Sequence, residues 1–314
     1  MEQKIQKLDM KSFYSKFGIA VVLVALVIIC SIASPRFLTS ENIKNVIRQC
    51  AISGVLAIGQ TFVILTGNID LSCGALMGLS AITSLSIQEQ GGNMWLGILA
   101  AMIMCLIFSF FNGYCISHGI PAFIMTLAMT EVITGVNYLI SNGMPIIAQV
   151  EAYEWFGQGK IGPVQAPVLV FALCFAIAYL FLKYAKMGRS IYAFGGNAES
   201  ARLAGINIRV VCICAFMISG IFAAISGIVT SSRLFAANPL TGEGAEHDAI
   251  AAVVIGGTKM SGGVGSIVKT VVGVFIIGIL TNILNLLGVS PYIQMISKGV
   301  IIFLAVVTDT WKRN

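Results

Sequence analysis

Ten apolar runs constrain this chain more than any other feature of its sequence. A helix needs about 20 apolar residues to cross the hydrocarbon core of a bilayer, and most of the runs approach that length. Only 10% of the residues are charged, whereas soluble domains contain about 25% charged residues. The sequence therefore predicts an all-α integral membrane protein with about ten transmembrane helices in a single domain, residues 1–314. The runs are Phe17–Ala33, Val46–Thr66, Leu71–Ile87, Met94–Ile116, Pro121–Ile140, Ala166–Leu182, Val210–Thr230, Ala249–Met260, Ile267–Leu287 and Ile293–Thr308.

The distribution of lysine and arginine indicates how the chain is oriented. Ten spans place both termini on one side of the membrane, and cytoplasmic segments carry an excess of basic residues. With both termini inside, thirteen basic residues fall in inner segments and five in outer segments. We therefore expect both termini to be cytoplasmic. The eighth run, Ala249–Met260, is short and interrupted by glycines, but omitting it would place the basic C-terminus outside.

Cysteine and histidine usage argues against metal binding and against catalysis. Most of the eight cysteines lie inside apolar runs and none forms a C-x-x-C pair, as expected of small apolar residues packed between helices. The two histidines, His118 and His247, lie outside the apolar runs, and no G-x-S-x-G motif occurs. An intramembrane enzyme would need a nucleophile with a base in reach. We expect no metal site, no cofactor and no enzymatic activity in this chain.

The inner loop, residues 183–209, contains the sequence of a short helix. Asn197 is a suitable N-cap, Glu199 favours the positive first turn, and Gly205 is a natural stop. A helix this short is not stable in isolation, so another surface must hold it. Ala198 and Ala201 leave one face without bulk. The helix could lie in the groove of a partner protein, or rest on lipid headgroups through its basic residues.

Five motifs, in order, resemble the membrane permease subunit of ATP-binding-cassette importers for monosaccharides, the ribose/xylose/galactose group. The resemblance runs from about Phe37 to Asp309. It implies a type II importer fold with short broken or re-entrant segments, a homodimer in the bacterial inner (plasma) membrane, and two partners. These partners are a cytoplasmic ATPase subunit, which performs the ATP hydrolysis, and an extracytoplasmic sugar-binding protein. The motifs are "GNIDLSCGALMGLSA" from Gly67, "IPAFIMTLAM" from Ile120, "GRSIYAFGGNAESARLAGINI" from Gly188, "GEGAEHDAIAAVVIGGTKMSGGVGS" from Gly242 and "NLLGVSPYIQMISKGVII" from Asn285.

The same resemblance implies a role for the inner loop. In this family the loop carries a coupling helix, which docks into a cleft of the ATPase subunit and transmits its closure. Small residues suit such a helix, because larger side chains would hold it out of the cleft. The residues implied to contact the ATPase are Gly196, Asn197, Glu199, Ala201, Arg202 and Gly205.

The segment "TGNIDLSCG" places a carboxylate between two apolar runs. A charged residue there must face protein, water or the interface. We expect a helix to begin at Leu71, with Asp70 capping its free N–H groups. Alternatively, Asp70 contacts sugar in the pathway together with its neighbours Asn68 and Ser72, since transporters use glycine-broken segments near the substrate route. The hinge-cap interpretation is favoured, and the second break at residues 256–265 is a candidate counterpart.

Other polar residues in the apolar runs are candidates for the solute pathway. Glu131 falls near the middle of the fifth run, where a carboxylate is costly. It could pair with Lys298, be protonated, or line a wet pathway and bind substrate hydroxyls. The amides of Asn137, Asn282 and Asn285 suit sugar hydroxyls, although interhelical hydrogen bonds would explain them equally well.

The outer connection, residues 231–248, carries Glu243, Glu246 and Asp248, which are candidates for docking the binding protein or form an ordinary solvated acidic loop. The predicted function is a permease subunit that moves a monosaccharide such as ribose into the cell. Another small solute, such as a nucleoside or an amino acid, is the alternative. A further alternative is an ion-coupled secondary transporter with Glu131 and Asp70 as its ion sites.

Overall fold

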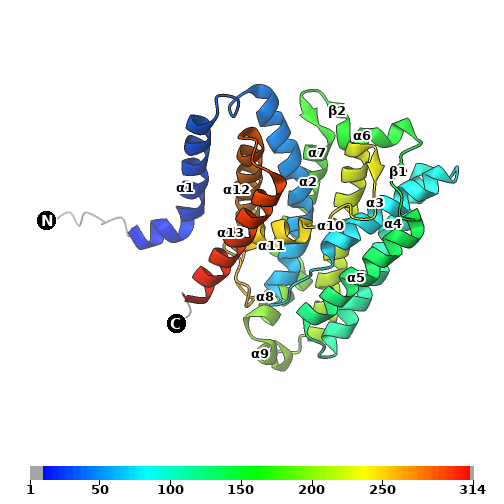
Figure 1. The fold of residues 1–314 in the computed structure, drawn as a ribbon. Helices are drawn as coiled ribbons and strands as arrows, with labels where there is room; N and C mark the ends of the chain where they lie inside the picture. The colour runs from blue at the N-terminus through cyan, green and yellow to red at the C-terminus, as the bar shows by residue number, and fades with distance from the viewer. Residues whose placement is uncertain (1–9, 312–314) are drawn as a thin grey trace.

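The computed structural model describes residues 10–311, which form a helical bundle (Figure 1). Lys4, Lys7, Lys312 and Arg313, which contribute to the predicted orientation, lie outside the described residues. Within the described range there are thirteen α-helices: α1 (Met10–Ala33), α2 (Ser40–Leu65), α3 (Cys73–Glu89), α4 (Met94–Ser117), α5 (Ala122–Ser141), α6 (Trp155–Gln158), α7 (Ala166–Tyr184), α8 (Lys186–Gly196), α9 (Ala198–Leu203), α10 (Ile208–Leu234), α11 (Ala245–Ile255), α12 (Ile267–Leu286) and α13 (Pro291–Trp311).

Each of the ten predicted apolar runs coincides at least in part with a helix, which confirms the predicted helical membrane architecture. Six helices within the described range are long and apolar enough to cross a membrane, namely α2, α4, α5, α7, α10 and α12. Helix α3 has 17 residues, nearly all of them buried inside the bundle. Helix α1 contributes the apolar stretch Gly18–Ala33. The chain therefore combines full-length spans with shorter helices.

Helix α11 differs from the predicted eighth span. It begins at Ala245 and ends at Ile255, so its 11 residues reach about 16 Å, roughly half the hydrocarbon thickness. The prediction that Ala249–Met260 is a complete span is therefore wrong. The chain continues beyond α11 as a loop, residues 256–266, which reaches the end of α2: the Gly263 N–H donates to the Leu65 carbonyl oxygen at 2.9 Å. Helix α11 and the loop that follows it together take the place of one membrane-spanning helix.

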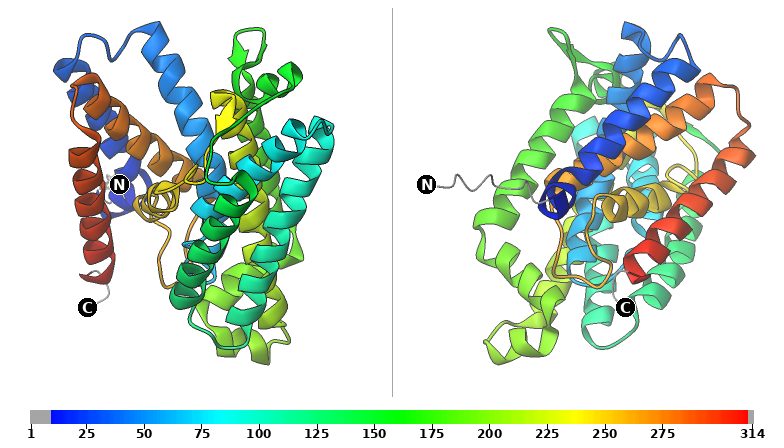
Figure 2. Two further views of the ribbon diagram at one scale, coloured as in Figure 1. Left: turned by 45° about the vertical axis from the view of Figure 1, so that its right-hand side comes forward. Right: turned by 90° about the vertical axis from the view of Figure 1, so that its left-hand side faces the viewer.

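Helix α10 occupies the centre of the bundle and packs against α2, α3 and α4. Glycines make this packing close. A Cβ added at Gly59 of α2 would lie 3.2 Å from the Ser219 backbone, and one at Gly113 of α4 would lie 2.7 Å from Ile213 Cα. Small residues let helices approach closely in lipid, where van der Waals contact drives association. Figure 2 shows α1, α12 and α13 grouped on one flank, opposite α3, α4 and α5.

Short strands and turns cover the end of the bundle opposite α8 and α9 (Figure 1). Strand β1 (Ile146–Ile147) pairs antiparallel with β4 (Ala236–Ala237), and β2 (Lys160–Ile161) pairs with β3 (Val164–Gln165). The 3₁₀ turn η1 (Glu151–Glu154) inserts Tyr153, whose hydroxyl lies 2.9 Å from Ser84 Oγ and 2.7 Å from Ser231 Oγ. These bonds tie the covering segment to α3 and α10.

Candidate functional site

The connection between α2 and α3 buries the Asp70 carboxylate. One oxygen, Oδ1, accepts from the Ser72 N–H at 2.9 Å and from Ser72 Oγ at 2.6 Å. The other, Oδ2, accepts from Ser219 Oγ of α10 at 2.9 Å. The Asp70 side chain is 0% exposed. The carboxylate therefore joins the start of α3 to the middle of α10.

The backbone of Asp70 is held as well. The Gln60 side-chain amide is oriented so that its nitrogen and its oxygen both have partners. Its nitrogen donates to the Asp70 carbonyl oxygen at 3.3 Å, and its oxygen accepts from the Asp70 N–H at 3.2 Å. Because Gln60 lies five residues before the end of α2, the chain folds back alongside that helix after Gly67. Ser72 in turn accepts from Asn112 Nδ2 of α4 at 2.9 Å. Helices α2, α4 and α10 thus all contact this break.

Helix α3 begins at Cys73, two residues later than predicted, and Ser72 is its N-cap residue. Asp70 does not bind the N–H groups of the helix itself; it forms a turn with Ser72 instead. The difference arises because Ser219 and Gln60, distant in sequence, hold Asp70 before the helix starts. Asn68 lies two residues earlier, half-buried, with Nδ2 donating to Thr66 Oγ1 at 2.9 Å.

Glu131 lies exposed on α5 and lines a cavity of about 240 Å³ between α5, α3 and the segment that leads into α11. That volume is just below the roughly 300–1,000 Å³ of pockets for drug-sized ligands, so it suits a smaller solute. Three carboxylates and three hydroxyls face the cavity. The lining residues are Ala75, Thr130, Glu131, Thr134, Pro239, Leu240, Thr241, Glu243 and Glu246.

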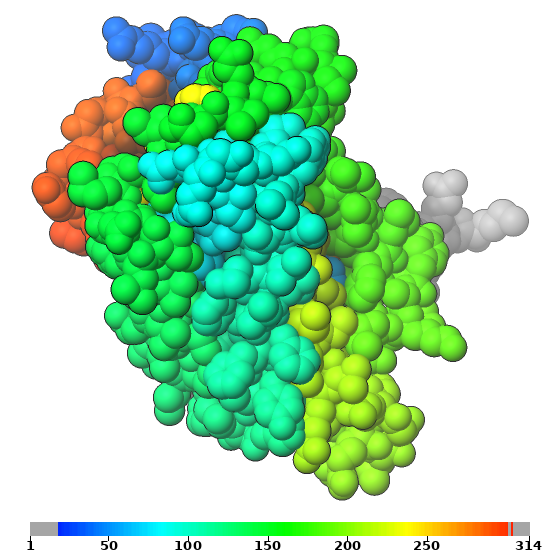
Figure 3. All heavy atoms as spheres, turned by 90° about the vertical axis from the view of Figure 1, so that its right-hand side faces the viewer, coloured from blue at the N-terminus to red at the C-terminus, as the bar shows by residue number. Residues whose placement is uncertain are grey.

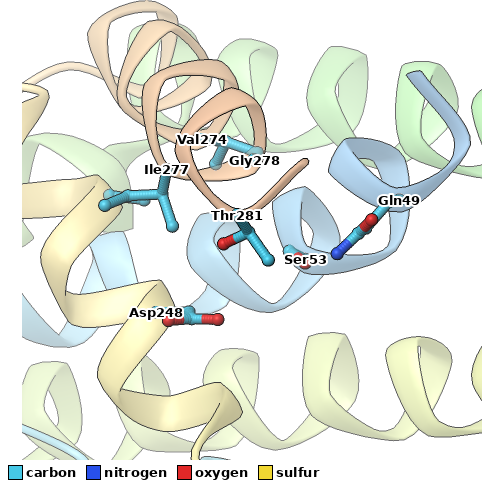
Figure 4. A pocket seen from close by; sticks show the side chains of 8 residues that line it. Gln49, Ser53, Asp248, Val274, Ile277, Gly278 and Thr281 are labelled. Atoms are coloured by element: carbon cyan, nitrogen blue, oxygen red, sulfur yellow. The ribbon is translucent and has the colours of Figure 1, made fainter. Parts of the chain in front are cut away.

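Of the three alternatives for Glu131, the pairing with Lys298 is wrong. Lys298 Nζ instead lies 2.7 Å from Asp248 Oδ2, and this pair joins α13 to α11. Asp248 also lines a small cavity of about 20 Å³ between α2, α11 and α12 (Figure 4). Gln49, Ser53 and Thr281 surround that cavity, whose volume is about that of one water molecule.

The three candidate asparagines all make contacts between elements. Asn137 of α5 is buried, and its Nδ2 donates to the carbonyl oxygens of Ala75 and Pro239, each at 3.4 Å. Asn282 of α12 exchanges two hydrogen bonds with Asn42 of α2, at 2.8 and 3.0 Å. Asn285 Oδ1 accepts from Gln294 Nε2 of α13 at 2.8 Å. These bonds favour the interhelical interpretation, and a pathway role for the amides stays a prediction.

The three acidic docking candidates do not form one exposed loop. Glu243 is exposed, but Glu246 and Asp248 lie in the first turn of α11. Glu246 is buried, and its Oε1 lies 2.8 Å from His247 Nδ1. Carboxylates are stabilised near a helix N-terminus, which explains their position. Of the three, Glu243 is the one that is exposed and that forms no ion pair with another described residue.

The inner loop contains two helices, α8 and α9, whereas the sequence analysis predicted one. The predicted helix is α9: the Asn197 side chain caps it by accepting from the Ser200 N–H at 2.8 Å, and Gly205 follows with a positive φ of +82°. Helix α8 was missed. Its signal is the apolar spacing of Met187, Ile191 and Phe194, which buries Ile191 against α2 and α7.

Helix α9 presents an open surface at the end of the bundle, and Figure 3 shows this region protruding beyond α4 and α5. Ala201 is buried, while Leu203 is 77% exposed. Glu199 Oε1 lies 2.7 Å from Arg202 Nη2, and this contact holds the pKa of Glu199 below its usual range. Leu203 was not among the predicted contact residues.

Comparison with known proteins places these features in a family context. The profile of a family described as "Branched-chain amino acid transport system / permease component" matches residues 42–306. The ribose import permease protein RbsC of Escherichia coli (strain K12) is 40% identical over 298 residues, with 93% of each chain covered. RbsC of Bacillus subtilis (strain 168) is 41% identical, over 99% of this chain and 97% of the relative.

A second sugar permease is also similar. The L-arabinose transport system permease protein AraH of Escherichia coli (strain K12) is 33% identical over 96% of this chain and 92% of its own length. No solved structure matches the chain.

Proposed function

The chain belongs to the branched-chain amino acid transport system / permease component family, and from this premise we propose that it carries a monosaccharide such as ribose into the cell. It is the multi-pass permease subunit of an ATP-binding-cassette importer and not an enzyme. The observation that carries the sugar assignment is 40–41% identity to ribose import permeases over nearly the whole chain. The similarity to an arabinose permease supports the same class of solute.

The α8–α9 segment is the surface we assign to the ATPase subunit. Helix α9 has only 6 residues and makes few contacts with the rest of the bundle. A helix of that length needs an external surface for stability, and its exposed Leu203 and the Glu199–Arg202 pair offer apolar and charged contacts. Gly196, Asn197 and Gly205 are exposed in the same segment, whereas Ala201 is buried against the bundle. We further propose that α9 and both termini are cytoplasmic, as the distribution of basic residues along the sequence predicts.

The cavity beside Glu131 is the part of the pathway we assign to the solute. A carboxylate in the middle of a span is too costly to face lipid, so this face of α5 requires water or another protein surface beside it. We assign that surface to a second copy of the chain, which gives a homodimeric permease with the path between its copies. Carboxylates accept hydrogen bonds from the hydroxyls of a neutral, polyhydroxylated solute, and threonine hydroxyls both donate to them and accept from them.

We assign Glu243, in the connection between α10 and α11, to contact with the extracytoplasmic binding protein. Glu243 is exposed and lines the same cavity as Glu131, so the proposed docking residue and the proposed solute path share one cavity. Because Glu246 is buried and Asp248 is paired with Lys298, these two are better placed to stabilise α11 than to bind a partner.

Reconstitution tests the function. The chain, co-purified with its ATPase and binding-protein partners, is placed in proteoliposomes and supplied with labelled ribose, a nucleoside or leucine. We expect ATP-dependent uptake of ribose that persists when ionophores collapse ion gradients. Uptake of leucine or the nucleoside in its place would overturn the sugar assignment. Uptake that needs an ion gradient and no ATP would identify a secondary transporter instead.

A further inference from the structure

Three glycine-containing segments meet at the end of α8, and we name this contact the glycine junction: Gly67 after α2, Gly195–Gly196 at the end of α8, and Gly262–Gly263 in the loop after α11. A Cβ added at Gly262 would lie 2.7 Å from Gly67 N and 2.9 Å from Gly195 Cα. One at Gly263 would lie 2.6 Å from Gly196 Cα. The three backbones therefore touch with no side chain between them.

Hydrogen bonds hold the same segments together. The Gly263 N–H donates to the carbonyl oxygen of Leu65, the last residue of α2, at 2.9 Å. The Tyr192 hydroxyl of α8 donates to the Gly265 carbonyl oxygen at 3.2 Å. Helix α8 is thus bonded to the loop, and the loop is bonded to α2.

Each of the three segments continues into an element that the preceding subsections single out. Beyond Gly196 the chain enters α9 through Asn197. Beyond Gly67 it passes through the buried Asp70 into α3. The loop with Gly262 connects α11, which carries the ion-paired Asp248, to α12. The junction is therefore where the inner surface segment meets both broken segments of the bundle.

Backbone contacts of this kind transmit displacement directly. A long side chain absorbs a shift by changing rotamer, whereas closely packed backbone moves as a unit. We propose that the glycine junction transmits movement of α8–α9 to the α2–α3 break and the α11–α12 loop, which makes Gly195 and Gly262 positioning residues for transport. The proposal rests on the proposed function, in which an ATPase subunit moves α9.

Two helical glycines provide a variant and a matched control. A Cβ at Gly195 would lie 2.5 Å from Gly263 N and against the Leu65 carbonyl oxygen, so the segments would have to part by about 1 Å to restore ordinary contact distances. A Cβ at Gly299 of α13 would meet nothing within 4 Å, and Gly299 lies outside both the glycine junction and the α8–α9 segment. Both are helical positions without positive φ, whereas Gly262 has a φ of +84° and would be strained by any substitution.

The experiment measures sugar imported per ATP hydrolysed by the complete complex in proteoliposomes. We expect Gly195→Ala to lower this ratio about tenfold or more, with the ATPase subunit still bound and ATP still hydrolysed, because overpacking disfavours the close contact. Gly299→Ala should keep the wild-type ratio. Equal ratios for the two variants in an assembled complex would overturn the proposal.

A second variant covers the case in which Gly195→Ala fails to fold. Tyr192→Phe removes the hydrogen bond to Gly265 without adding bulk, and it should lower the ratio about threefold to tenfold. A wild-type ratio for Tyr192→Phe would then count against the junction. If the unmodified complex shows no ATP-dependent uptake at all, the proposed function fails, and the two failures are thereby distinguished.

Discussion

Replacement of Asp70 separates the two roles considered for this carboxylate. In Asp70→Ala the Ser72 N–H loses its acceptor at 2.9 Å, and Ser219 Oγ loses a partner that links α3 to α10. In Asp70→Asn the remaining carbonyl oxygen can still accept from Ser72. The new amide faces Ser219, whose hydroxyl can rotate to accept from it. A structural role therefore predicts that Ala is damaging and Asn is tolerated.

The magnitude follows from the burial of the site. A buried N–H without a partner costs about 1–3 kcal/mol. The Ser219 hydroxyl can turn to a carbonyl oxygen of its own helix, so it adds little. With the space left by the missing carboxylate, Asp70→Ala should cost about 3 kcal/mol, a loss of roughly 5–10 °C in unfolding temperature. Asp70→Asn should cost less than about 1 kcal/mol.

Thermal unfolding of the purified variants in detergent and ATP-driven uptake in proteoliposomes together provide the assay. We expect unfolding temperature and uptake to fall together in Asp70→Ala and both to be largely preserved in Asp70→Asn. Two results would refute this reasoning. An Asn variant as unstable as the Ala variant would mean that the charge itself is required, and an Ala variant of normal stability without uptake would indicate direct contact with the solute.

Three further predictions address the other sites. Glu131→Gln should leave the unfolding temperature within about 2 °C, because the residue is exposed, but should reduce uptake about tenfold or more; unchanged uptake would remove Glu131 from the pathway. Asn197→Ala removes the side-chain cap of α9 at a cost of about 1 kcal/mol. The affinity for the ATPase subunit, measured by titration, should therefore fall about fivefold, and Asn197→Ser should restore that affinity. Lys298→Ala should lower the unfolding temperature slightly, because its ion pair with Asp248 is 25–30% exposed and contributes about 1 kcal/mol at most. Adding Asp248→Asn should recover part of that loss. A further decrease in the double variant would contradict the pairing.

Local sequence determined the helices and their chemistry. Runs of apolar residues predict spans because the bilayer imposes a length and satisfies no backbone hydrogen bonds. The cap of α9 was predictable for a similar reason, since the Asn197 side chain acts on a backbone group three residues away. The five quoted motifs were sufficient to identify the monosaccharide permease family, which the similarity to RbsC and AraH confirms.

Tertiary structure decided which residues meet. Lys298 and Glu131 are both charged residues within apolar runs, but packing brings Lys298 to Asp248, 50 residues away in sequence. No helix begins at Leu71, because Ser219, 149 residues beyond Asp70, holds the Asp70 carboxylate. The contact of Gly67, Gly195 and Gly262 is likewise invisible in the sequence, where glycines are frequent and their partners unspecified. Such contacts depend on how whole helices pack, and no local pattern encodes that.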